Sequence, residues 1–153
     1  MKRYILFLLS GVLLSGTIAC QNVTKTSSDA PSSTQESPKS PTKQVVQKSQ
    51  KNAESLTRRT QLNSDIRARE QRNNISGGTT NRVDSDLASE VRDKLQANIP
   101  RSQLVVDAKK GIVTVSGTVN DQQNLKKIEP LTMQIKGVKS VVNKSTFIAT
   151  KSN

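Results

Sequence analysis

The chain has 153 residues, of which only 32% are hydrophobic and 2% aromatic, and its formal net charge is +12. A core without aromatic residues must be small and aliphatic, and such domains are only modestly stable. Absence of histidine and the presence of one cysteine remove the usual general base, the usual zinc ligands and any internal disulfide. These features exclude most enzymes and metal or cofactor proteins, and the charge predicts anionic partners.

The N-terminus has the pattern of an export signal. Lys2 and Arg3 precede an apolar run over residues 4–14, which is shorter than the roughly 20 residues that a membrane span needs. Ile18-Ala19-Cys20 then resembles the bacterial lipobox, in which the cysteine is acylated and the bond before it is cut, although Thr17 stands where that pattern favours Leu.

The lipobox resemblance implies that residues 1–19 are a signal peptide and that Cys20 is the lipidated first residue of the mature chain. We therefore expect an exported protein, anchored through Cys20 and facing the periplasm. By resemblance to the sorting rule of enterobacterial lipoproteins, Gln21, which is not Asp, points to the outer membrane rather than the inner one. The alternative interpretation is an ordinary secreted protein with an incidental cysteine.

Residues 20–80 are predicted to be a disordered basic linker. Ser, Thr, Gln, Lys and Pro dominate up to about residue 51, and Pro31, Pro38 and Pro41 interrupt any helix. No segment there has enough apolar surface to offset the entropy of ordering. As a flexible coil this linker would have a reach of about 40–45 Å, so it would hold a domain well clear of the membrane surface.

Residues 52–74 allow a second interpretation. Prolines are absent, and arginines cluster there: Arg58, Arg59, Arg67, Arg69 and Arg72. Leu62 and Ile66 lie one helical turn apart, but this apolar stripe is too narrow for a stable isolated helix. The segment is either a solvated part of the linker or an arginine-rich helix that lies on anionic lipid or docks on the folded domain.

A folded domain is predicted over residues 81–150, followed by a short tail over residues 151–153. Asp84 is an expected N-cap, and Leu87, Val91 and Leu95 recur at the spacing of an amphipathic helix that ends before Pro100. Two β-branched runs follow, over residues 103–108 and 112–119, and predict a β-hairpin.

The rest of the domain predicts a second helix and a last strand. The helix begins after Asn120 or Asp121, and its expected buried side chains are Ile128, Leu131 and Ile135. Pro130 predicts a kink or a late start, and Gly137 is the expected stop. In the hairpin, Gly117 predicts a bulge or a closely packed helix. With a strand over residues 138–148 the order is αββαβ, an α+β fold.

The run Gly111-Ile-Val-Thr-Val-Ser-Gly-Thr-Val119, with Gly137-Val138 some twenty residues later, resembles the BON domain, named for osmotically inducible and nodulation proteins of bacteria. The resemblance covers less than half of the chain and only one copy, and Pro130 departs from the pattern. It implies a three-stranded mixed sheet with two helices on one face. It also implies binding of phospholipid or membrane interfaces, and a role in envelope integrity or osmotic-stress tolerance.

The candidate lipid-headgroup contacts are six lysines: Lys109, Lys110, Lys126, Lys127, Lys136 and Lys139. Each has a solvated lysine as its alternative interpretation. Gly111, Gly117 and Gly137 are expected to serve the backbone conformation rather than a ligand. We predict no catalytic residue, because carboxylates such as Asp84 and Glu90 are explained by helix capping.

Two functions remain after the other partners are excluded. Nucleic acid is not an expected partner, because stacking aromatic residues are lacking, and no small-molecule substrate is predicted. The first function is engagement of an anionic phospholipid or membrane surface. The alternative is a membrane-tethered protein-interaction module that uses its sheet edge or sheet face to bind an envelope protein.

Overall fold

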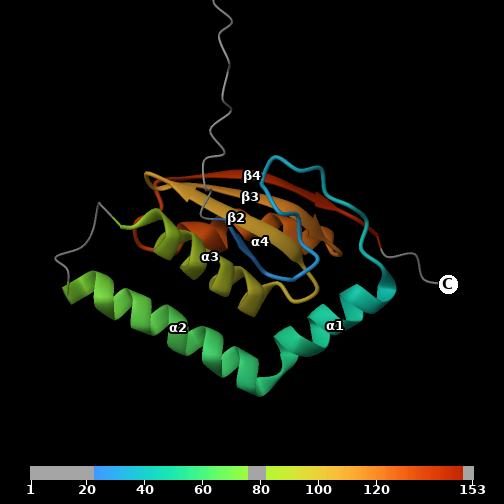
Figure 1. Cartoon of the computed structure of the whole chain (residues 1–153), viewed down its shortest axis with the longest axis horizontal. Helices are drawn as coiled ribbons and strands as arrows, with labels where there is room; N and C mark the ends of the chain where they lie inside the picture. Colours follow the sequence, from blue (N-terminus) through green and yellow to red (C-terminus); the bar gives the residue numbers. More distant parts are fainter. Residues whose placement is uncertain (1–22, 76–81, 150–153) are drawn as a thin grey trace, which may run out of the picture.

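The structure, a computed structural model, describes residues 23–75 and 82–149 (Figure 1). The predicted signal peptide, Cys20 and the tail over residues 151–153 lie outside these residues. The helices are α1 (Lys43–Glu54), α2 (Leu56–Ile75), α3 (Asp84–Asn98) and α4 (Gln122–Met133). The strands are β1 (Thr24–Lys25), β2 (Gln103–Lys109), β3 (Ile112–Val119) and β4 (Ser140–Phe147).

The four strands form one mixed sheet in the order β1-β2-β3-β4. β2 pairs with both β1 and β3 in antiparallel fashion, whereas β3 and β4 are parallel. The predicted hairpin, the mixed sheet and the order αββαβ after residue 82 are confirmed. The predicted strand number is wrong, because β1, from the expected linker, adds a fourth strand by pairing Thr24 with Val106.

The core lies between one face of the sheet and the helices α3 and α4. Leu87, Val91 and Leu95 of α3 are buried, as their periodicity predicts, and they pack with Val113 and Val115 of β3. From α4 and the turn after it come Ile128 and Ile135, which are buried, and Leu131, which is partly buried. Because every one of these side chains is aliphatic, the fold depends on close packing over a small area.

Residues 23–75 contain β1, α1 and α2, so this segment is not a linker along its whole length. Pro41, the last proline of the expected linker, precedes α1 instead of interrupting it, and Thr42 caps the helix by accepting a hydrogen bond from the Val45 amide. Val46 of α1 and Leu62 of α2 are buried. Figure 1 shows α2 along α3, with α3 between α2 and the sheet. The prediction of two helices is therefore wrong, because α1 and α2 pack onto the domain.

Two local expectations on α3 and β3 are corrected. Asp84 is the first residue of α3 rather than its N-cap, and its carboxylate accepts a hydrogen bond from the Lys110 amide at 2.8 Å. The ladder between β2 and β3 is regular, so Gly117 makes no bulge. A Cβ at Gly117 would lie 2.0 Å from the carbonyl oxygen of Gln103, so β2, not a helix, makes the close approach.

Helix α4 also departs from expectation. It starts directly after Asp121, whose carboxylate accepts a hydrogen bond from the Gln123 amide, and it continues through Pro130. The prediction of a late start is therefore wrong. The helix ends at Met133, before Gly137, and Gly137 lies in the following turn with φ of +101°. Pro130 is exposed, so its ring does not disturb the core.

Candidate functional site

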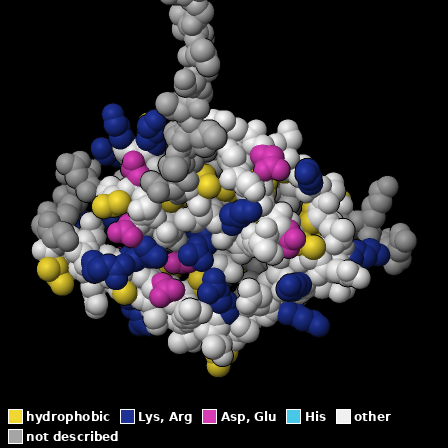
Figure 2. All heavy atoms as spheres, in the orientation of Figure 1, with side chains coloured by type: hydrophobic (Ala, Val, Ile, Leu, Met, Phe, Trp, Pro, Cys, Tyr) yellow, Lys and Arg dark blue, Asp and Glu magenta, His cyan; other side chains and the backbone are white. Residues whose placement is uncertain are grey.

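One end of the BON-like fold collects basic side chains from three segments. The turn between β2 and β3 meets the start of α3 through the bond from the Lys110 amide to Asp84, and it meets the loop before β4 through a 2.8 Å bond from the Lys139 amide to the Gly111 carbonyl. We call this the basic end; it comprises Arg82, Lys109, Lys110, Lys136 and Lys139. Figure 2 shows Lys and Arg side chains at the upper left, over the end of the sheet where β3 and β4 begin.

A hollow of about 450 Å³ opens at the basic end, and Lys110 and Lys139 line it. Among the described residues, neither amine lies within ion-pair distance of a carboxylate. Asp84 also lines the hollow, but its carboxylate accepts the backbone amide of Lys110. The two lysines therefore offer positive charge to an external anion.

Two glycines allow basic side chains to cross the backbone at this end. Gly111 has φ of +85°, and a Cβ there would lie 2.9 Å from Cδ of Lys139. Gly137 has φ of +101°, and a Cβ there would lie 2.7 Å from Cδ of Arg82. Both positions combine a left-handed conformation with a close neighbour, so a larger residue at either would displace a cation of the site.

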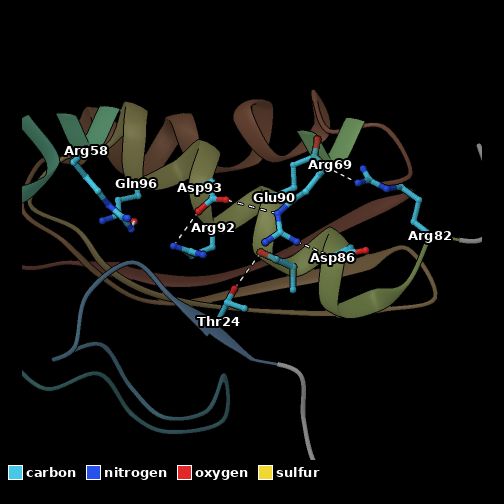
Figure 3. Close-up of polar contacts among 10 residues, drawn as sticks. Thr24, Arg58, Arg69, Arg82, Asp86, Glu90, Arg92, Asp93 and Gln96 are labelled. Carbon is cyan, nitrogen blue, oxygen red and sulfur yellow. Dashed lines mark hydrogen bonds and ion pairs between the residues drawn. The ribbon is translucent and has the colours of Figure 1, made fainter. Parts of the chain in front are cut away.

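Arg82 has a structural partner inside the domain. Its Nη1 donates to the Lys136 carbonyl at 2.7 Å. Its Nη2 donates to Oε2 of Glu90 (Figure 3). The Glu90 side chain is 0% exposed and that of Arg82 4%. Burial raises the pKa of Glu90, whereas the hydrogen bond and charge of Arg82 oppose that rise. Arg82 therefore neutralises an internal carboxylate and positions the Lys136 backbone. The cations that line the hollow and can contact an external anion are Lys110 and Lys139.

Exposed aliphatic side chains lie at the basic end as well. Val83 lines the hollow and is 65% exposed, and Ile112, at the start of β3, is 48% exposed. Ile75 ends α2, where the Lys136 amine donates to Asn74 at 3.3 Å, and it is 87% exposed. Surfaces that bind a lipid headgroup layer typically combine basic side chains with exposed aliphatic ones, as this end does.

The structure does not bring all six candidate lysines together. Lys109, Lys110, Lys136 and Lys139 belong to the basic end. Lys126 and Lys127 are exposed on the first half of α4 and do not line the hollow, and the Lys127 amine donates to Oδ1 of Asn124 at 3.3 Å. This separation makes the α4 pair a natural control for the basic end.

Sequence reasoning missed a second polar region, between α2 and α3. Arg69 of α2 lies 2.8 Å from Asp86 and 4.0 Å from Asp93, and Arg58 donates to Gln96 at 3.1 Å (Figure 3). The arginine-rich segment thus docks on the domain, which was one of its two interpretations. A signal was present in the sequence, because Asp86 and Asp93 lie two turns apart on the side of α3 opposite Leu87 and Leu95.

Asp93 is the most constrained group of this second region. Its side chain is 1% exposed, and Oδ1 lies 2.9 Å from Nη1 of Arg92 without hydrogen-bond geometry. Burial raises the pKa of Asp93, against the opposing charges of Arg92 and Arg69. Glu90, which sequence reasoning assigned to capping, is likewise an interior group of α3. Removal of a cation partner, Arg82 for Glu90 or Arg69 of α2 for Asp93, would leave a buried carboxylate less compensated.

A basic groove also runs between α2 and α3. It has a volume of about 470 Å³ and is lined by Arg59, Asn63, Ile66, Arg67, Lys94, Ala97 and Asn98. These lining residues include no carboxylate, so the groove is a second surface that attracts anions. It lacks the strongly exposed aliphatic side chains that accompany the basic end.

The described residues contain no helix long and apolar enough to cross a membrane, and no group of three His, Cys, Asp or Glu residues that would hold a metal. Fold and site together define a small α+β domain whose distinguishing chemistry is a basic surface. Residues 83–149 match the family model of the BON domain, so this part of the chain is a BON domain. No curated protein and no solved structure matches the chain.

Proposed function

We propose that this protein is an envelope lipoprotein whose BON domain binds anionic phospholipid through the basic end, in support of envelope integrity or osmotic-stress tolerance. The presence of a BON domain agrees with a general role in the envelope or in osmotic stress. The observation that supports lipid binding is the grouping of Lys109, Lys110, Lys136 and Lys139 with exposed Val83 and Ile112 at one end of the sheet.

The strength of such binding follows from the charges. A basic residue near an anionic membrane contributes about 1 kcal/mol, so four lysines give a dissociation constant in the millimolar range. Binding of this strength depends on salt and on the fraction of anionic lipid. A second attachment, such as acylation of Cys20, would be needed to keep the domain on the membrane.

Vesicle flotation of the chain from residue 20 with Cys20→Ser tests this proposal. We expect binding to phosphatidylcholine vesicles to rise as phosphatidylglycerol is added and to fall with salt. Lys110→Gln with Lys139→Gln should reduce binding about 30-fold, because each of the two lost contacts contributes about 1 kcal/mol. Binding that is independent of phosphatidylglycerol would contradict the proposal.

Two control variants remove the same positive charge elsewhere. Lys126→Gln with Lys127→Gln changes α4, and Arg59→Gln with Arg67→Gln changes the groove between α2 and α3. Both should bind more strongly than the variant of the basic end. Equal losses in all three variants would show that only the net charge matters, and a larger loss in the arginine variant would move the site to the groove.

A second candidate function is protein binding at β4. This strand is at the edge of the sheet and pairs only with β3 in the described structure, and Val142 and Phe147 on it are exposed. Such an edge can accept a strand from a partner. If no variant of the flotation series binds vesicles, and Val142→Asp abolishes association with an envelope protein in membranes, this function is favoured instead.

A further inference from the structure

The first described strand lies very close in the sequence to the proposed lipid anchor. β1 begins at Thr24, so three residues, 21–23, separate it from Cys20. Its position on the BON domain is fixed by several contacts. The Thr24 hydroxyl donates to the Ala88 carbonyl of α3 at 3.1 Å, and the Thr26 amide donates to the Leu104 carbonyl at 2.8 Å.

Thr26 strengthens this attachment from inside the domain. It is buried, and its hydroxyl oxygen accepts the Leu104 amide at 2.8 Å while the hydroxyl lies 3.2 Å from the Ser102 carbonyl. Residues 24–26 therefore bind the start of the described chain to the edge of β2. We call these three residues the clasp.

The register of the clasp sets the direction in which the chain leaves it. β1 is antiparallel to β2, with Lys25 opposite Val105 and Thr24 opposite Val106. Toward the N-terminus the chain therefore heads for Lys109, at the end of β2, and the turn at Lys110. That turn belongs to the basic end, so the N-terminal end of β1 points toward the side of the lysines.

The reach of the chain between anchor and clasp is short. The four Cα–Cα steps from Cys20 to Thr24 span at most about 14 Å when fully extended. The distance from Val106 to Lys110, the residue after β2, is also four Cα–Cα steps, or about 13 Å. The connection is therefore no longer than the distance from the clasp to the basic end, and it is much shorter than the reach of about 40–45 Å expected for a disordered linker.

We propose that the clasp holds the BON domain directly on the membrane surface, with its basic end facing the phospholipid headgroups. This inference rests on the proposed function, because it requires acylated Cys20. The four lysines then act within one anchored molecule, and a millimolar affinity is sufficient at the effective concentration that a short connection gives. Residues 27–75 follow the clasp in the sequence and include α1 and α2, which pack against the domain. They therefore do not lengthen the connection between Cys20 and the domain.

Distance-dependent quenching in the lipidated protein tests the orientation. Fluorophores are placed on Ser140→Cys, at the basic end, or on Gln122→Cys, at the opposite end near Phe147. The length of β4 separates these ends by about 23 Å. Acylation blocks Cys20, so only the introduced thiol is labelled. In neutral phosphatidylcholine vesicles that contain a headgroup-attached nitroxide lipid, we expect the Ser140→Cys label to be quenched several-fold more than the Gln122→Cys label.

Changing the length before the clasp provides the decisive comparison. A Gly/Ser insert of about 20 residues before Val23 adds a reach of about 25 Å and should remove the difference between the two labels. The same insert after Ser152 should preserve it. Thr24→Ala with Thr26→Ala should weaken the difference by releasing the clasp. Equal quenching in the unmodified protein, or a difference that survives the insert before Val23, would overturn the inference.

The two proposals can fail separately. If the Cys20→Ser protein does not bind anionic vesicles but the labels differ in neutral ones, lipid affinity is wrong and the clasp stands. If the protein binds anionic vesicles but the labels are quenched equally, the clasp is wrong and lipid affinity stands. An intact mass without acyl chains on Cys20 would overturn the clasp and the lipoprotein proposal together.

Discussion

The two sides of helix α3 make contacts of opposite chemistry. Toward the sheet, Leu87, Val91 and Leu95 pack among aliphatic side chains and are fully buried. Toward α2, Glu90 and Asp93 are just as buried but are charged, and they depend on Arg82, Arg92 and Arg69. On the surface, Figure 2 shows basic and acidic side chains side by side over the region of α2 and α3.

This contrast teaches that equal burial does not mean equal stabilisation. Burial of an aliphatic side chain stabilises the fold by about 1.5–3 kcal/mol without any partner of fixed geometry. A buried ion pair gains little net free energy, but the loss of one partner is costly because the other charge stays desolvated. We therefore expect the sheet side of α3 to determine whether the domain folds, and the α2 side to determine how firmly residues 23–75 are attached.

The largest expected effect comes from breaking the most buried ion pair. Arg82→Met leaves Glu90 buried without its cation and should lower the free energy of unfolding by about 3–5 kcal/mol. Urea denaturation of the Cys20→Ser chain, followed by circular dichroism, measures this loss. Arg82→Met with Glu90→Met should recover most of it, because no unpaired charge remains. A double variant as unstable as the single one would mean that the arginine acts by packing.

The aliphatic side of α3 is tested by Leu95→Ala. This change leaves a cavity in the core and should cost about 2–5 kcal/mol. Because Leu95 belongs to the core between α3 and the sheet, amide exchange should accelerate in β2, β3 and α4 together. Acceleration confined to α3 would show that the core is not one cooperative unit.

Leu62→Ala makes the matched change on α2, and its effect should be smaller and local. Leu62 is the one residue of α2 that is buried and aliphatic, so its truncation should loosen α2 by up to about 2–3 kcal/mol. Amide exchange in α2 should accelerate while β3 stays protected. Loss of protection in β3 as well would show that α2 is an integral part of the BON domain core.

The smallest expected effect is a dependence of stability on pH. Glu90 and Asp93 have pKa values raised above 4.5 and 3.8 by burial, so the folded protein binds protons more readily than the unfolded chain at these two sites. Their contribution to stability is fully present below those ordinary values and is lost as the pH rises through the folded-state pKa values.

This dependence is measured with two variants. Asp93→Asn should flatten the fall of the urea midpoint as the pH rises above the ordinary aspartate pKa of 3.8, because the titrating group is removed. Glu129→Gln, at an exposed position of α4, should leave the slope unchanged. An unchanged slope in Asp93→Asn would mean that this carboxylate does not titrate in that range.

Much of the domain could be predicted from residue patterns. Leu87, Val91 and Leu95 recur at helical spacing, and Val113 and Val115 recur at strand spacing. These spacings locate the helix and the hairpin, because each places its apolar side chains on one face only in that type of secondary structure. The basic end could be predicted only in part. Lys109 and Lys110 are neighbours in the chain, but their proximity to Lys139 depends on the bond from the Lys139 amide to the Gly111 carbonyl.

The arrangement of residues 23–75 is a different case. Their composition is that of a linker, and no local pattern shows that Thr24 and Thr26 complete a sheet edge or that Arg69 finds two carboxylates on α3. The sequence by itself determined the aliphatic core and the αββαβ order, because apolar periodicity acts over a few residues. Tertiary structure alone decided the fourth strand, the docking of α2 and the direction of the chain toward Cys20. Those depend on hydrogen bonds and ion pairs between segments far apart in the sequence, whose partners exist only once the domain has folded.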